Sequence, residues 1–415
     1  MKVLHLSTSD MTGGAARAAF RLHRGLVESG IHSRMLVQNK SGTDTLVAGS
    51  DTRWGRYLAM LKYTVDSLPA IISRRGRGAT FSPALFPDRI ARHVAGIAPD
   101  INHLHWIAGG FMKVETLPHL HGPLVWTLHD MWPFTGGCHY SSECSRYTDS
   151  CGCCPALGSS AEDDLSRRIW QRKARAWRAL PLTLITPSRW MAECAAMSSL
   201  FSEADIRVIP NGINTTLFHP GDRSMARKIL GLPLDRRLIL FGAMSPTSDP
   251  RKGLQHLLPA LKDLANNGWG ERAELLVYGG SLSEKTPDFG IKARPMGQVS
   301  DETLVLLNCA ADVLVAPSTQ DNLPNTVMEA MACGTPAVAF KIGGMPDMID
   351  HGESGWLAHP FDHKDLARGI IHVIENAGHR EKMGKQARKK IVREYAENIV
   401  ARRHINLYEE LLGKE

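Results

Sequence analysis

Several features that would assign a chain to a large class of proteins are missing from this sequence of 415 residues. No apolar run reaches the roughly 18 residues that a helix needs to span a bilayer. No zinc-finger, RRM or helix-turn-helix pattern occurs, so we expect no nucleic-acid partner. The first apolar run breaks at Ser7, and a glycine turn follows where a signal peptide would have a cleavage site. We therefore expect a cytoplasmic protein.

The size and composition of the chain predict a globular protein with more than one core. Hydrophobic residues make up 43% of the sequence and charged residues 22%, which is enough apolar material for two cores. Because a chain of this length exceeds one ordinary domain, we predict two. The net charge of +7 comes from 49 basic and 42 acidic residues, so it allows an anionic partner without selecting one.

The stretch Ala316–Phe340 predicts a β-loop-α-β unit of a parallel sheet. It starts at the end of an apolar run of strand length, Asp312–Ala316. Thr326–Ala332 is rich in helix formers and is followed by Gly334, and Pro336–Phe340 is typical of a second buried strand. We therefore expect a ligand-binding loop after the first of these strands.

Two carboxylates frame this loop and helix. Asp321 stands at the start of the loop and Glu329 stands inside the helix, with seven residues between them. Free N–H groups at the helix start favour anions, and carboxylates accept charge-assisted hydrogen bonds from sugar or ribose hydroxyls. The alternative is an ordinary parallel unit with solvated acids.

Two further turns have the composition of phosphate-binding loops. A strand at Lys2–Ser7 leads through Gly13–Gly14 into a helix at Ala15–Glu28, a Rossmann-like opening in which the glycines let backbone N–H groups approach a phosphate. A simple tight turn would explain the two glycines equally well. Later in the chain, Arg251 and Lys252 stand together at a helix start, and both cations suit a diphosphate.

A histidine and a cysteine-rich segment follow one another in the first half of the chain. His129 comes directly after a predicted strand, where a side chain can orient a substrate or move a proton, although a structural role is the alternative. Five of the eight cysteines lie between positions 138 and 154. In a reducing cytoplasm such a cluster predicts a structural metal site, with the ligands Cys138, Cys144, Cys151 and Cys154.

Zinc is the ion that we expect at this cysteine cluster, and an iron–sulfur cluster is the second interpretation. The spacing fits common zinc ribbons only in part, so His139 or Cys153 is an alternative for one of the four ligands.

Two basic segments with aromatic residues raise the question of membrane contact. In the segment Arg53–Arg77, one helical face carries Trp54, Tyr57, Leu58, Leu61 and Val65, and three arginines follow it. A second basic segment spans Arg167–Leu180. Such helices lie on membrane surfaces, and equally often they pack on their own domain.

The central stretch resembles a known family. Its order is Asp321, Asn322, Leu323, Pro324, Asn325, Glu329, Ala330, Met331, Gly334, Pro336, which resembles the acid-seven-acid signature of family 4 retaining glycosyltransferases. The first acid of that family is usually Glu, whereas Asp321 is one methylene shorter. Around residues 126–140 the chain is similar to members from bacterial exopolysaccharide clusters of the colanic-acid type.

The resemblance implies a GT-B fold, α/β, with two Rossmann-like domains facing across a cleft. We expect an acceptor domain at residues 1–205 with a cysteine-rich loop at 136–156, and a nucleotide-sugar donor domain at 206–390. A last helix within 391–415 is expected to return to the first domain.

The resemblance also implies a function, which is transfer of a sugar with retention from a UDP- or GDP-sugar to a hydroxyl acceptor. A saccharide or lipid-linked saccharide of surface polysaccharide synthesis is the expected acceptor, with the enzyme peripheral on the inner face of the plasma membrane. No cofactor is expected for catalysis. The alternatives are a nucleotide-sugar 2-epimerase of similar fold and a non-enzymatic nucleotide-sugar-binding protein.

Site residues follow from the same resemblance. The implied catalytic residues are His129, Asp321 and Glu329. Lys252 matches a family lysine, and Arg251 would replace an arginine that the family carries near Ala243 or Met244. The implied donor-binding residues are Gly13, Gly14, Arg251, Lys252, Gln298, Asn322, Leu323, Pro324 and Glu329.

Overall fold

The computed structural model describes residues 1–50, 52–73, 80–242, 249–280 and 288–413. Its contacts divide the chain into two compact units, Met1–Gly212 with Glu397–Glu415, and Ile213–Ala396. We call them the first and the second unit. Both boundaries lie a few residues after those expected from the sequence, which were 205/206 and 390/391. Ala243 and Met244 fall outside the described residues.

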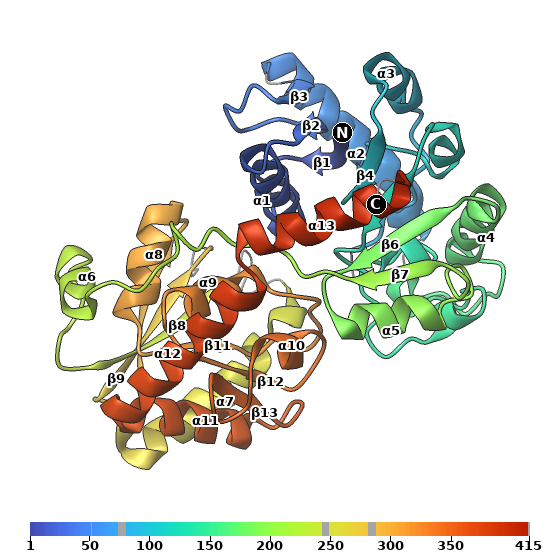
Figure 1. The fold of residues 1–415 in the computed structure, drawn as a ribbon. Helices are drawn as coiled ribbons and strands as arrows, with labels where there is room; N and C mark the ends of the chain where they lie inside the picture. Colours follow the sequence, from blue (N-terminus) through green and yellow to red (C-terminus); the bar gives the residue numbers. More distant parts are fainter. Residues whose placement is uncertain (51, 74–79, 243–248, 281–287, 414–415) are drawn as a thin grey trace. The chain divides into compact units, whose positions relative to one another are not determined.

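The first unit contains a parallel sheet of seven strands in the order β3-β2-β1-β4-β5-β6-β7 (Figure 1). The middle strands β1, β4, β5 and β6 are buried almost throughout, although β1 and β4 also carry polar residues. The strands are β1 Lys2–Ser9, β2 His32–Asn39, β3 Val47–Ser50, β4 Ile101–Leu104, β5 Leu124–Thr127, β6 Leu182–Thr186 and β7 Asp205–Val208.

Three helices of the first unit begin at a capping side chain or at glycine. Asp164 accepts hydrogen bonds from two amides at the start of α4, and Ser188 accepts one at the start of α5. Gly13 occupies the corresponding position before α1. The helices are α1 Gly14–Glu28, α2 Arg53–Ser73, α3 Ile90–Ile97, α4 Leu165–Trp177, α5 Arg189–Met197 and α13 Glu397–Leu411.

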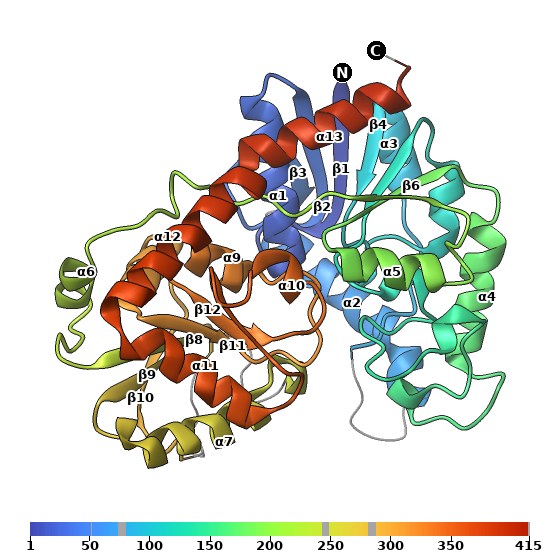
Figure 2. The same cartoon turned by 60° about the horizontal axis from the view of Figure 1, so that its bottom comes forward.

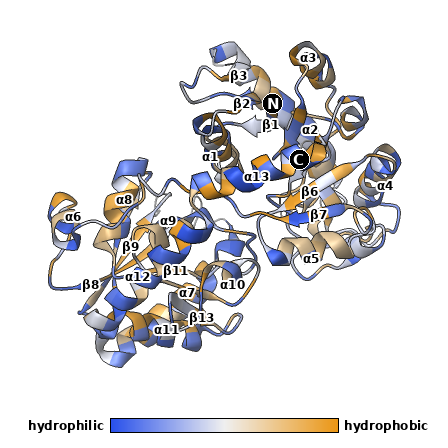
Figure 3. Ribbon diagram, in the orientation of Figure 1, coloured by the Kyte–Doolittle hydropathy of each residue, from blue (hydrophilic) through white to orange (hydrophobic). Residues whose placement is uncertain are grey.

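The last helix, α13, packs against α1 and the sheet of the first unit (Figures 1 and 2). Hydrophobic and hydrophilic residues alternate along it (Figure 3), and its buried side includes Val400, Leu407 and Tyr408. A Cβ atom added to Gly25 of α1 would lie 3.2 Å from the Cβ of Ala401, so the two helices approach closely. The resemblance implied a final helix on this domain.

The second unit is a parallel sheet of six strands in the order β10-β9-β8-β11-β12-β13. Its strands are β8 Arg237–Gly242, β9 Ala273–Tyr278, β10 Lys292–Gly297, β11 Val313–Ala316, β12 Ala337–Phe340 and β13 Gly355–Ala358. Its helices are α6 Arg223–Ile229, α7 Leu254–Leu264, α8 Asp301–Ala310, α9 Asn325–Ala332, α10 Met345–Met348, α11 His363–Glu375 and α12 Ala377–Glu394. The predicted β-loop-α-β unit is confirmed as β11, α9 and β12.

Each sheet has the strand order of a doubly wound Rossmann-like fold. In the first unit the order reverses between β1 and β4, and in the second unit between β8 and β11. The predicted fold class of two Rossmann-like α/β domains is confirmed. Ligands of such sheets bind outside the carboxyl ends of the strands at these reversals, so the loops there are the first place to look for a site.

Within the described ranges, no helix combines the length and the apolar character needed to cross a membrane.

A buried carboxylate ties the second unit together at the opposite end of β11. Asp312 is 0% exposed, and its Oδ2 accepts hydrogen bonds from Arg227 Nη2 at 2.8 Å and from the amide of Leu238 at 2.7 Å. Arg380 of α12 forms an ion pair with Oδ1 at 3.2 Å. Asp312 therefore joins α6, β8, β11 and α12.

We predict that Asp312→Ala lowers the free energy of unfolding by about 3–5 kcal/mol, because two arginines lose a buried partner. The measurement is denaturant unfolding of the purified protein. Asp235→Ala is the control, since Asp235 is exposed and its loss should change stability by less than about 0.5 kcal/mol. Equal effects of the two substitutions would contradict the prediction.

Candidate functional site

In the second unit, the loops that follow β8 and β11 lie in contact at the reversal of strand order. Gly253 has φ +75°, and a Cβ atom there would lie 1.7 Å from the carbonyl oxygen of Pro317, so only glycine fits. The amide of Thr319 donates to the carbonyl of Arg251 at 2.8 Å. The turn that carries Arg251 and Lys252 is thus held against the loop that carries Asp321.

Two predicted site residues, Lys252 and Asp321, are brought together by this contact. Lys252 Nζ lies 2.8 Å from Asp321 Oδ2, with the lysine side chain 30% exposed and the carboxylate 10% exposed. Arg251 instead pairs with Asp249, with Nη2 at 2.7 Å from Oδ2. The two neighbouring cations therefore point to different carboxylates. A positive group and an acceptor of hydroxyl hydrogen bonds stand side by side at the strand ends.

The backbone of Asp321 is fixed by the loop after β12. The amide of Gly344 donates to the carbonyl of Asp321 at 3.2 Å. Gly343 has φ +51°, and a Cβ atom there would lie 1.9 Å from the same carbonyl oxygen. The close approach of these two loops requires glycine at position 343 and holds Asp321 in place.

The rest of the predicted set in this unit is buried around the start of α9. Asn322 and Glu329 are each 3% exposed, and Leu323 packs into the hydrophobic core. Pro324 is the residue before α9, where it offers no side-chain cap. Gln298 is exposed just after β10, whose last residue, Gly297, accepts a hydrogen bond from the amide of Gly279 just after β9. Asp321, Glu329 and Gln298 thus belong to loops or helix starts at one edge of the sheet.

In the first unit, the glycine turn opens the helix α1 at the reversal of strand order. Gly13 has φ +93°, and no atom lies within 4 Å of a Cβ built on it, so this turn has open space beside it. Asp10 is fully buried and accepts hydrogen bonds from the amides of Ser41 and Gly42 at 2.9 and 2.8 Å. Thr8 joins β1 to the loop after β4 through the carbonyls of Trp106 and Ala108. Gly14 begins the helix directly behind the turn.

His129 is half-buried and ends a row of histidines, which we call the histidine stack. The other members are the buried His5, His103, His105 and His404. His129 Nε2 lies 3.0 Å from His105 Nδ1, and His105 Nε2 lies 2.9 Å from His5 Nδ1. Burial lowers the pKa of His129 to about 4, although the Asp130 carboxylate opposes this shift. His129 is therefore a neutral imidazole at physiological pH.

Three members of the stack, His5, His103 and His105, bring ring nitrogens within 4.8 Å of one another. Both nitrogens of His103 already have partners, Tyr408 Oη at 2.6 Å and Thr127 Oγ1 at 2.7 Å. The rings of His103 and His105 lie face to face with centroids 4.3 Å apart, so their lone pairs do not converge on one point. We interpret the set as a hydrogen-bonded stack that joins α13 to the sheet.

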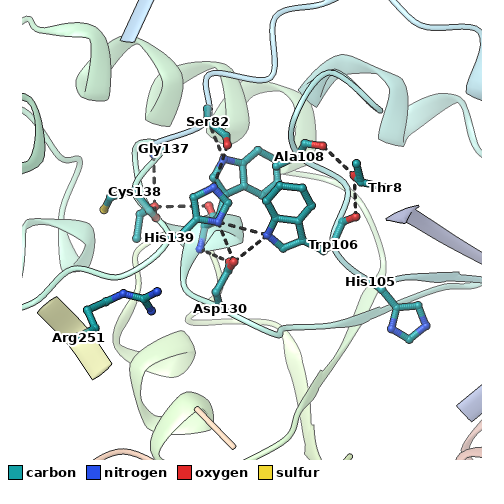
Figure 4. A network of polar contacts seen from close by, with 12 residues as sticks. Thr8, Ser82, His105, Trp106, Ala108, Asp130, Gly137, Cys138, His139 and Arg251 are labelled. Carbon is teal, nitrogen blue, oxygen red and sulfur yellow. Dashed lines mark hydrogen bonds and ion pairs between the residues drawn. The ribbon is translucent and has the colours of Figure 1, made fainter. Parts of the chain in front are cut away.

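Asp130, next to His129, is the centre of a polar network (Figure 4). Its Oδ2 accepts hydrogen bonds from Trp106 Nε1 at 2.9 Å and His139 Nδ1 at 2.7 Å, and its Oδ1 accepts one from the amide of Trp132. Burial alone would raise the pKa of Asp130, but the His139 charge and these hydrogen bonds outweigh it and hold the pKa below its usual value. Ser82 completes the network at His139 Nε2.

The four predicted metal ligands, Cys138, Cys144, Cys151 and Cys154, line one small cavity beside this network. Both ring nitrogens of His139 have partners in the network, which removes it as an alternative ligand. The thiol of Cys153 points to Ser160 and Glu162 instead.

Two family profiles match adjoining parts of the chain. The profile described as Glycosyltransferase Family 4 matches residues 12–217, and the one described as Glycosyl transferases group 1 matches residues 222–390. The chain belongs to the group 1 and family 4 glycosyltransferases. The resemblance carried by the central stretch is confirmed at this level.

Curated relatives match parts of this glycosyltransferase. An uncharacterised glycosyltransferase of Methanocaldococcus jannaschii is 28% identical over 248 residues, which is 56% of this chain and 61% of that protein. A D-inositol 3-phosphate glycosyltransferase of Acidothermus cellulolyticus is 31% identical over 186 residues, which is 41% of this chain and 40% of that protein. The chain spans about half the length of these relatives.

Solved structures resemble this glycosyltransferase over its whole length. Sucrose-phosphate synthase of Thermosynechococcus elongatus has a TM-score of 0.70 at 18% identity and covers 100% of both chains. HepE of Anabaena, solved with UDP-glucose, has a TM-score of 0.65 at 17% identity and covers 99% of this chain and 100% of its own. At these identities the likeness shows the fold, which is GT-B.

Three residues of the first unit's polar networks were not predicted from the sequence: Ser82 and Trp106 of the Asp130 network, and His105 of the histidine stack. They lie in a loop or near the end of β4, far in sequence from Asp130. A signal was present in the alternation of His103, His105 and an adjacent Trp106 within a strand-length apolar run. Polar residues at buried strand positions need partners, and this could have directed attention to them.

We predict that the free energy of unfolding falls as pH decreases from 7 to 5. The pKa values of His23 and His404 are lowered to about 4 by burial, so below pH 6.5 the unfolded chain binds protons that the folded chain does not. Each such histidine contributes about 1–2 kcal/mol to the loss. Denaturant unfolding at several pH values measures it.

The matched variants are His404→Gln and His119→Gln. Removal of the buried His404 should make the dependence on pH shallower, whereas removal of the exposed His119 should leave it unchanged. The same slope in both variants would contradict the assignment to buried histidines.

Proposed function

We propose that this glycosyltransferase moves a sugar from a nucleotide diphosphate donor to a hydroxyl acceptor with retention at the anomeric carbon. The observation that carries the proposal is the Lys252–Asp321 pair at the reversal of strand order, with Glu329 buried in the helix behind it. A cation and two carboxylates at this edge suit the two chemical parts of such a donor, a diphosphate and sugar hydroxyls.

The proposed roles follow the growth of charge during the reaction. Negative charge develops on the diphosphate as the bond to the sugar breaks, and fixed cations lower the barrier there. We assign this role to Lys252 and Arg251, and the contact with the donor ribose to Glu329. Asp321 would hold hydroxyls of the transferred sugar, and Gln298 the nucleobase. Asn322, Leu323 and Pro324 shape the backbone between the two carboxylates.

In the first unit we assign donor contact to the turn Gly13–Gly14, whose open space would allow a phosphate to approach. His129 is assigned to the transferred sugar. Its lowered pKa keeps the ring neutral, so it can both donate and accept hydrogen bonds without adding charge.

Retention is proposed to proceed by attack on the same face that the leaving group departs from. The acceptor oxygen forms a bond to the anomeric carbon while the bond to the phosphate oxygen breaks, and the leaving phosphate takes the acceptor proton. Fixed cations then stabilise the negative charge on the leaving diphosphate, and this mechanism needs no catalytic metal. The 2-epimerase and the non-enzymatic binding protein are the competing functions.

Titration calorimetry with UDP, GDP and ADP tests the donor site. We expect one nucleotide to bind best, and the UDP-glucose complex of HepE makes UDP the first to try. Lys252→Ala should weaken binding by about 1–3 kcal/mol, the range for a charged hydrogen bond, while Lys364→Ala on the exposed surface of α11 should not. Glu329→Gln should weaken the binding of all three nucleotides by a similar factor, because each of them contains the ribose that Glu329 is proposed to contact.

Absence of binding by all three nucleotides would contradict the proposal. Product analysis then separates the functions: a transferase releases free nucleoside diphosphate only when an acceptor is present. An epimerase converts the nucleotide-sugar without an acceptor, and a binding protein does neither.

We further propose that α2 contacts a membrane surface, where a lipid-linked saccharide acceptor of exopolysaccharide synthesis would lie. The inward side of α2 carries small or polar residues, including Ala59, Asp66 and Ala70, each 3% exposed or less. Asp66 fixes the chain at residues 84–86 by accepting three amide hydrogen bonds. The large apolar residues of α2 are exposed: Trp54, Tyr57, Leu58, Met60, Leu61, Tyr63, Val65, Leu68, Ile71 and Ile72.

α2 packs on its own unit through its small and polar side, and its large apolar side chains form the opposite, exposed side. Trp54 is 76% exposed and Ile72 is 80% exposed, at the two ends of the helix. The exposed Arg53 on α2 matches anionic headgroups in charge, whereas Arg168 on the neighbouring α4 forms an ion pair with Asp163. Arg74, Arg75 and Arg77 lie outside the described residues.

Co-sedimentation with vesicles tests this surface. We expect the protein to bind vesicles containing anionic lipid, and Trp54→Ser with Ile72→Ser to weaken binding more than about tenfold, because each side chain loses apolar burial. Ile229→Ser is the control, because Ile229 is an exposed apolar residue of α6 outside this surface. Unchanged binding by the α2 variant would remove this helix from the proposed membrane contact.

A further inference from the structure

The cysteine-rich loop contains a small enclosed space that its thiols surround. Its cavity measures about 20 Å³, enough for one water-sized particle, and four cysteines of three loop segments line it: Cys138, Cys144, Cys151 and Cys154. All eight cysteines of the chain are free thiols. Neighbouring thiols without a disulfide, around a space the size of one ion, are the donor set that tetrahedral zinc prefers.

The backbone of the loop reverses sharply beside this cavity. Three successive residues, Cys151, Gly152 and Cys153, have φ of +57°, +97° and +42°. Non-glycine residues rarely adopt this conformation, and it persists where surrounding interactions require it. A Cβ atom at Gly152 would lie 2.5 Å from the carbonyl of Glu162, so this reversal of the chain packs tightly. Because of this reversal, Cys151 and Cys154 line the cavity, whereas the Cys153 thiol lies against the carbonyl of Ser160.

Burial raises the pKa of the Cys138, Cys151 and Cys154 thiols, and two groups beside the cavity act against this effect at Cys151. The amide of Gly136 donates to the Cys151 sulfur at 3.1 Å. Lys173 is 0% exposed, and it lies near enough to Cys151 and Cys138 to interact with their charges. Its Nζ binds the carbonyls of Trp132 and Thr135, which hold it in place. A zinc ion with four thiolates carries a net charge of −2, and a buried cation offsets part of it.

We propose that Cys138, Cys144, Cys151 and Cys154 bind one zinc ion, which closes the loop beside the Asp130 network. The thiols must turn inward to do so. Among the described residues, no three cysteine sulfurs lie within 4.8 Å of one another, whereas zinc bonds of about 2.3 Å bring tetrahedral sulfurs to about 3.8 Å. Rotation about χ1 moves each sulfur between staggered positions, and the cavity provides the space between them.

The proposed ion acts on the loop that carries His139. Cys138 directly precedes His139, which donates through Nδ1 to Asp130 and forms a hydrogen bond through Nε2 with the Ser82 hydroxyl. The hydroxyl of Thr135 donates to the carbonyl of Cys138 at 2.5 Å. A fixed Cys138 therefore fixes the position of His139. This role is structural, so it stands independently of the proposed sugar transfer.

Elemental analysis of the full-length protein, purified under reducing conditions without chelators, tests the proposal. We expect about one zinc per chain, and loss of most of it in Cys151→Ser or Cys138→Ser. Cys153→Ser is the matched control, because its thiol lies two residues from Cys151 and points away from the cavity. Iron in place of zinc, metal-free protein, or equal loss in Cys153→Ser would overturn the assignment.

A second measurement is independent of whether the serine variants fold. Cobalt(II) added to reduced, metal-free protein should produce the intense visible absorption of a tetrahedral thiolate site, and zinc should abolish it. Thiol titration of the denatured protein without reductant should count eight free cysteines once the metal is removed. Absence of the cobalt spectrum, or disulfides among these four cysteines, would overturn the proposal.

Discussion

Parallel pairing of every strand is the constraint on which both candidate sites depend. In each sheet, the carboxyl ends of all strands lie at one edge, so loops far apart in sequence are brought together there. The Lys252–Asp321 pair joins loops that follow β8 and β11, which are separated by two other strands in the sequence. Gly253, in the loop after β8, allows close approach to Pro317, and Gly343, in the loop after β12, allows close approach to the carbonyl of Asp321.

The first unit differs in that polar side chains are buried along its central strands. His103 stands in the buried central strand β4 and His105 follows directly after it. The ring nitrogens of His103 have partners in β5 and α13, and His105 bonds to His129. Asp130 has the same requirement and meets it through Trp106 and His139. Because each buried polar atom needs a partner, these networks connect the last helix and the cysteine-rich loop to one sheet.

Much of the fold and part of the site could be predicted from local pattern. The strand at Lys2–Ser7, the helix before Glu28 and the unit around Asp321 all follow from hydrophobic periodicity and from glycine positions. The catalytic roles of Asp321 and Glu329 were predicted from the resemblance to family 4 glycosyltransferases, not from local pattern. The pairing of Arg251 with Asp249 could not be predicted, because adjacent cations look equivalent in a sequence and only their side-chain directions differ.

The sequence by itself determined the element order, the two-domain division and the family, because these depend on residue types at regular spacing. Tertiary structure alone decided which cysteines share a cavity, since Cys153 and Cys154 are neighbours in the chain and face opposite ways. It also decided that the large residues of α2 face outward, with Ala59 and Ala70 inward. An amphipathic pattern defines two faces of a helix, but only the packing of the whole unit determines which face is buried.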